Sequence, residues 1–119
     1  PSVPSFTIGS TLENLNFAAG GEHDEWSSIY PEMAKTAEAE GFLKIAETYR
    51  KIAEVEKGHE ERYQLLAKQV KEGTVFKRKS ETVWKCRNCG YLYKGLEAPA
   101  SCPLCGHPQS FFQMQEQLE

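Results

Sequence analysis

Two stretches of the chain carry apolar side chains at the alternating intervals of three and four residues that are typical of a packed helix. Gly41 and Gly73 follow them as stop residues, and Pro31 predicts a kink or a restart within the first. The pattern predicts two antiparallel helices, over about 11–40 and 42–72, joined at Gly41. The first stripe runs Leu15, Ala18, Glu22, Glu25 and Ile29, and the second runs Phe42, Ile45, Tyr49, Ile52, Glu56, His59, Tyr63, Leu66 and Val70.

Each stripe is interrupted in its middle by ionisable residues, Glu22 and Glu25 in the first and Glu56 and His59 in the second. Such groups on a buried stripe cost several kcal/mol unless a partner or a metal ion compensates them. Glu-x-x-His on an inward-facing helix is the repeating unit of di-iron carboxylate bundles, and this donor mixture suits iron or manganese. The alternative is a Glu–His pair that only forms a hydrogen bond.

Several neighbouring residues carry weaker signals. Ser10 and Glu13 fit a capping box at the start of the first helix, after an extended, proline-containing arm over residues 1–10. Tyr30 is placed to donate a hydrogen bond to a ligand carboxylate, with plain core packing as the alternative. We expect His23 to point away from the stripe into solvent.

The composition changes after a basic linker over residues 74–82. Strands are expected at 82–85 and 111–114, on either side of two Cys-x-x-Cys-Gly motifs that predict a tetrahedral four-sulfur metal site. So small a module requires a metal as its core. The site alone slightly favours zinc over iron, and His107 is expected at the surface. The cysteines are Cys86, Cys89, Cys102 and Cys105.

Composition narrows the class of protein. The chain has 119 residues and a net charge of −3, which gives no electrostatic reason to expect a nucleic-acid partner. It contains no apolar run near the ~20 residues that cross a membrane. Paired cysteines of this kind are typical of metal sites in a reducing compartment, so a cytoplasmic location is expected.

Five segments of the chain together resemble the rubrerythrin family, which consists of non-haem di-iron peroxidases. The resemblance implies that Glu22, Glu25, Glu56 and His59 are di-iron ligands at the catalytic site, with Tyr30 beside them. Glu25 matches the carboxylate that one iron gains on oxidation and releases on reduction. The resemblance also implies that the four cysteines bind one iron, in place of the zinc favoured above. The resemblance rests on residues 14–15, 21–26, 30–31, 52–63 and 84–91.

The fold implied is α+β: a ferritin-like helical hairpin over 11–73, then a rubredoxin-like β module over 83–119. The family has four bundle helices, and this chain carries only the second pair. The hairpin is therefore half of a four-helix bundle, which a separate chain or a second copy must complete. The separate chain is favoured, because residues 1–10 resemble the end of the crossover that joins the two pairs.

The function implied is reduction of hydrogen peroxide to water, with electrons passing through the four-cysteine iron from a rubredoxin or an NAD(P)H-dependent reductase. Two other readings stay open. One is a zinc-ribbon hairpin that only binds a partner, and the other is ferroxidase or iron-handling activity.

Overall fold

The computed structural model describes residues 8–118, and the chain divides after Lys71 into two compact units. The expected α+β architecture is confirmed: the first unit is a helical hairpin and the second is a small β module. Most of the arm expected over 1–10 lies outside the described residues. None of the described helices is both long enough and apolar enough to cross a membrane.

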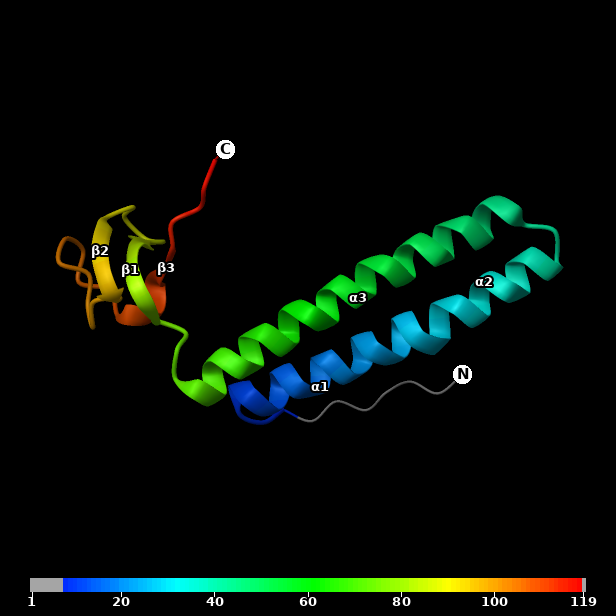
Figure 1. Ribbon diagram of the computed structural model, residues 1–119, viewed down its shortest axis with the longest axis horizontal. Helices are drawn as coiled ribbons and strands as arrows, with labels where there is room; N and C mark the ends of the chain where they lie inside the picture. The colour runs from blue at the N-terminus through cyan, green and yellow to red at the C-terminus, as the bar shows by residue number, and fades with distance from the viewer. Residues whose placement is uncertain (1–7, 119) are drawn as a thin grey trace. The chain divides into compact units, whose positions relative to one another are not determined.

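The hairpin consists of α1 (Thr11–Asp24), a π-helical turn (Glu25–Ile29), α2 (Tyr30–Ala39) and α3 (Leu43–Glu72). In Figure 1, α3 runs back alongside α1 and α2. The predicted capping box is present, because the Glu13 N–H donates to Ser10 Oγ at 3.2 Å and the Ser10 N–H donates to Glu13 Oε1 at 3.1 Å. Gly41 has φ +88°, so a residue tolerant of the left-handed region makes the turn into α3.

The break expected near Pro31 takes the form of a π turn. The Tyr30 N–H donates to the Glu25 carbonyl, five residues back, instead of four. Pro31 has no N–H to donate to the preceding turn, which removes one hydrogen bond of a regular α-helix. The Ser27 hydroxyl donates to the His23 carbonyl at 2.6 Å. The helix thus contains a widened turn over Glu25–Ile29, and Pro31 follows it at the start of α2.

Small side chains form the contact between the helices. Ala34, Ala37 and Ala46 make one buried cluster, and Ala19 and Ala67 are also buried. Larger apolar side chains of the predicted stripes stay exposed in the hairpin, with Ile29 at 46%, Met33 at 37% and Ile45 at 47%. They line an open groove of about 560 Å³ near the closed end of the hairpin. Alanine contacts bring the helices together, while the bulky side chains near the closed end are exposed and those farther along α3, such as Ile52 and Leu66, are half-buried.

The β module contains a three-stranded antiparallel sheet in the order β2-β1-β3. Its strands are β1 (Lys77–Cys86), β2 (Leu92–Glu97) and β3 (Phe112–Met114), with a short 3-10 helix at Gln109–Phe111. The two expected strands are found. β1, however, begins at Lys77, inside the segment 74–82 assigned above as a linker, because Lys77 pairs with Glu97 beyond an irregularity in the register. β2 was not anticipated.

The core of this module combines aromatic and cysteine side chains. Trp84 and Cys86 are fully buried with Phe112, Ala98 and Cys102. The Trp84 indole N–H donates to the Gly95 carbonyl at 3.2 Å, so its polar atom is satisfied. The core of the module thus includes two of the four cysteines, Cys86 and Cys102.

Truncation of this indole tests the core. Trp84→Ala should destabilise the β module by about 3–5 kcal/mol, because it leaves a cavity and removes the largest buried side chain. Calorimetric unfolding measures the loss. Leu96→Ala, at a 56% exposed position on the same sheet, is the control and should change stability by less than about 0.5 kcal/mol. Equal effects of the two substitutions would contradict this description of the core.

Candidate metal centres

One group of possible ligands lies between α1 and α3. Glu22, Glu56 and His59 each offer an atom, and these atoms lie within 4.8 Å of one another. His59 Nδ1 lies 3.3 Å from Glu56 Oε2 and 3.6 Å from Glu22 Oε1. The two carboxylates are largely covered, whereas the His59 side chain is 51% exposed. The structure therefore brings three of the four predicted bundle ligands together.

The electrostatics of this group indicate a missing positive charge. Burial, together with the adjacent Glu56, raises the pKa of Glu22 to about 7. A hydrogen bond from Glu22 lowers the pKa of Glu56, so the two carboxyl groups share a proton. Among the described residues, Glu22 Oε2 is buried without a hydrogen-bond partner. A metal cation would replace the shared proton and use the orphaned oxygen.

Glu25 and Tyr30 border this group. Burial, then interaction with Glu56, raises the pKa of Glu25, so its carboxyl lies in the same electrostatic environment. Burial and the nearby Glu25 and Glu56 charges also raise the pKa of Tyr30. Within the described part of the chain, the Tyr30 hydroxyl forms no hydrogen bond to a carboxylate, and its ring packs 6.0 Å from that of Tyr49. The structure thus places Tyr30 near the carboxylates, with its ring in the packing role.

Two neighbours of the ligand group differ from expectation. Glu60 was not anticipated, yet it is a buried carboxylate with 9% of its surface exposed. His23, expected to be solvated, is half exposed and places Nδ1 3.1 Å from both Glu60 oxygens. A signal for Glu60 exists in the sequence: it lies seven residues after Ala53 and seven before Ala67, on the alanine row that forms the helix contact.

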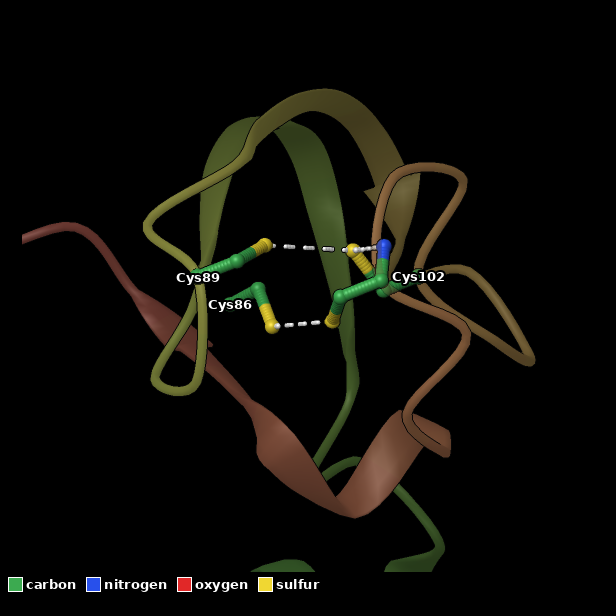
Figure 2. Close-up of side chains that lie close together, drawn as sticks. Cys86, Cys89 and Cys102 are labelled. Atoms are coloured by element: carbon green, nitrogen blue, oxygen red, sulfur yellow. Dashed lines mark hydrogen bonds between the residues drawn. The ribbon is translucent and has the colours of Figure 1, made fainter.

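The second candidate centre is the four-cysteine cage. Cys86 Sγ lies 3.7 Å from Cys105 Sγ, and Cys89 Sγ lies 3.6 Å from Cys102 Sγ (Figure 2). All four sulfurs lie within 4.8 Å of one another. A tetrahedron with metal–sulfur bonds of about 2.3 Å has edges of about 3.8 Å. The cage therefore fits a single tetrahedral ion, as the spacing of the cysteines predicts.

The loops of the cage stabilise negative sulfur. The His107 backbone N–H lowers the pKa of Cys105 to about 5, and the Asn88 side chain adds to this effect. The Tyr91 backbone N–H lowers the pKa of Cys89, but burial and the neighbouring sulfurs outweigh it and raise that pKa to about 12. Four thiolates this close require a cation to hold them.

His107, expected at the surface, is partly buried. Its Nδ1 is buried without a hydrogen-bond partner among the described residues. Its ring packs 4.5 Å from the ring of Phe111. Within the described part of the chain, the group of possible cage ligands consists of the four cysteines and does not include His107.

The two donor sets differ in chemistry. Carboxylates and an imidazole suit iron or manganese, and four thiolates suit iron or zinc. The two sites together therefore match a carboxylate–histidine group of the di-iron type and a rubredoxin-like four-cysteine site.

Comparison with known proteins extends over nearly the whole chain. The rubrerythrin family model matches residues 3–82, and the model of the rubrerythrin rubredoxin-like domain matches residues 84–113. Rubrerythrin of Porphyromonas gingivalis is 52% identical over 94% of this chain and 56% of its own length. Rubrerythrin of Nitratidesulfovibrio vulgaris is 43% identical over 95% of this chain and 59% of its own length.

Solved structures give the same result. Nigerythrin in a partially reduced state matches with a TM-score of 0.53 and 30% identity, over 97% of this chain and 54% of that one. The chain spans about half the length of the curated relatives it matches. Because the family model covers more than half of this chain, the sequence belongs to the rubrerythrin family.

Proposed function

We propose that this protein acts as a non-haem di-iron peroxidase that reduces hydrogen peroxide to water. The observation that supports this most is the donor group between α1 and α3, where a buried oxygen of Glu22 has no hydrogen-bond partner among residues 8–118 and lies beside an imidazole and a second carboxylate. A four-thiolate cage in the same chain adds a second site suited to iron.

In this proposal, Glu22, Glu25, Glu56 and His59 hold the iron pair together with ligands from two further helices. When bound, the two ions supply the two electrons that peroxide needs to form two molecules of water with two protons. The carboxylates balance a charge that changes with oxidation state. The Tyr30 hydroxyl keeps its proton because its pKa is raised, so it can donate a hydrogen bond toward the carboxylates.

The cage would serve as the entry point for electrons. Cys86, Cys89, Cys102 and Cys105 would hold one iron, which accepts single electrons from a donor such as a rubredoxin or an NAD(P)H-dependent reductase. Hydrogen bonds to sulfur, such as those at Cys105, are among the features that set the potential of iron–thiolate centres. Cys89 is an exposed residue, so this side of the cage lies at the surface of the module, where a donor could approach.

The exposed stripe of the hairpin supports a partner for the bundle. Ile29, Met33 and Ile45 form an apolar surface in a groove near the closed end of the hairpin. Burial of such surface contributes roughly 25 cal/mol per Å². We propose that a second hairpin with its own Glu-x-x-His covers this stripe and completes the ligand set, whether it belongs to another chain or to a second copy.

The ligand assignment is tested by substitution within α3. Glu56→Ala should remove the bundle iron and retain the cage iron, because only the carboxylate–histidine group loses a donor. Glu54→Ala, at an exposed position on the same helix, should retain both. Metal analysis of the iron-loaded protein measures the difference. The same iron content in the two variants would remove the case for this site.

The electron-entry role is tested at the cage. Cys102→Ser should bleach the visible absorption of a ferric four-thiolate centre and stop peroxide turnover driven by an external reductase. Oxidation of a pre-reduced bundle site by peroxide should continue at nearly the wild-type rate, because its ligands are untouched. If both activities disappear together, the cage is structural and the relay role is wrong.

Assembly is tested by sedimentation. The 119-residue chain with Fe(II) should sediment as a pair of copies or together with a second hairpin chain, since a lone hairpin leaves its stripe in water. Intact mass of every chain in the particle identifies which. A folded monomer that binds two bundle irons would overturn this part of the proposal.

A further inference from the structure

A second polar cluster lies beside the proposed ligand group, and we call it the Glu60 cluster. Glu60 Oε1 accepts a hydrogen bond from the Trp26 indole N–H at 2.8 Å, and His23 Nδ1 lies 3.1 Å from both oxygens. The His23 ring meets Trp26 edge-on at 5.1 Å, and Lys57 Nζ lies 5.2 Å from the Trp26 ring centre. Glu60 is the one charged side chain found buried within residues 8–118.

Each residue that donates or accepts a hydrogen bond in this cluster comes directly after a proposed ligand in the sequence. His23 follows Glu22, Trp26 follows Glu25, and Glu60 follows His59. One residue turns an α-helix by about 100°, so the cluster occupies the flank next to the ligand face at the same height. The contacts of the cluster join α1 and the π turn to α3. They therefore fix how each helix is rotated about its own axis at the level of the proposed ligands.

The Trp26 contact has a specific target. Trp26 lies within the π turn, and Glu25 is the residue at which that turn begins. π-helical turns are short, rare irregularities inside α-helices that are frequent at functional sites. Trp26, the second residue of the turn, donates a hydrogen bond to the buried Glu60 carboxylate on α3. This contact fixes the turn through a residue that is not itself a proposed ligand. The direction of the Glu25 side chain is therefore tied to Glu60.

We propose that Glu60 and Trp26 are positioning residues that hold the π turn so that Glu25 points toward the metal site. This inference rests on the proposed role of Glu25 as a ligand. Neither Glu60 nor Trp26 is expected to touch the metal or peroxide. A hydrogen bond that only strengthens the hairpin would act on all the ligands alike, whereas a positioning contact acts through Glu25 alone. The two roles differ in a double-mutant cycle.

The test uses Mn(II) binding to the full chain, because Mn(II) suits carboxylate and imidazole donors far better than thiolates. Electron paramagnetic resonance of free and bound Mn(II) gives the affinity. Trp26→Phe keeps the ring and removes the N–H, and should weaken binding about tenfold, the low end for outer partners of metal ligands. In Glu25→Ala and Glu25→Gln backgrounds, the same substitution should change the affinity by less than about twofold.

Two matched variants sharpen the result. Glu60→Gln keeps an oxygen that accepts from Trp26 and should retain most of the affinity, whereas Glu60→Leu should behave like Trp26→Phe. Glu61→Gln, at the adjacent exposed position, should match the wild type.

The outcomes separate this inference from the proposed function. An equal loss with and without Glu25, or no loss at all in Trp26→Phe, overturns the positioning role while the metal site stands. Absence of Mn(II) binding by the wild-type chain, measured with the second hairpin chain present where sedimentation identifies one, overturns both. A loss confined to the background that retains Glu25 supports the inference.

Discussion

The ligand group of this protein depends on the pairing of α1 and α3 in the hairpin, which brings Glu22 together with Glu56 and His59. Alanine at Ala34, Ala37 and Ala46 lets α2 and α3 meet without bulky side chains between them. At the level of Glu22 and Glu56, the hairpin brings together one carboxyl group from α1 and one from α3. Burial and the adjacent Glu56 raise the pKa of Glu22, and interaction with Glu22 lowers the pKa of Glu56. Crowded carboxylates of this kind are unfavourable for folding and favourable for a cation, so one arrangement costs stability and creates affinity.

Both centres hold several negatively charged groups close together, and they stabilise these groups in different ways. In the cage, backbone N–H groups of short loops stabilise sulfur, and Cys86 and Cys102 belong to the hydrophobic core itself. In the hairpin, the ligand face remains half open, with His59 exposed and apolar side chains around it. The cage is complete within one module, whereas the hairpin presents half of a binding surface.

Much of this could be predicted from the sequence, since the signals were local. Helix periodicity, the capping box at Ser10 and the cysteine spacing each depend on a few adjacent residues, and the structure confirms them. The burial of Glu60 was not predicted, because a glutamate is ordinarily expected in solvent. Its burial depends on contacts with Trp26 and His23, which lie far from it in the sequence. β2 was not predicted because most of its residues are exposed and show no burial pattern. Its extended conformation depends on pairing with β1.

The π turn also changes how the first helix should be read. Ala19 and Ala34 are both buried and lie fifteen positions apart, one more than two heptads. The wider turn absorbs the additional residue and returns the buried face to α3, whereas a strictly periodic count is out of register by one residue after the turn. A shorter version of this segment, lacking one residue, would keep both alanine faces in register as a continuous α-helix. What it would lose is the distinct backbone setting of Glu25, so the additional residue changes the placement of this carboxylate and leaves the alanine packing as it is.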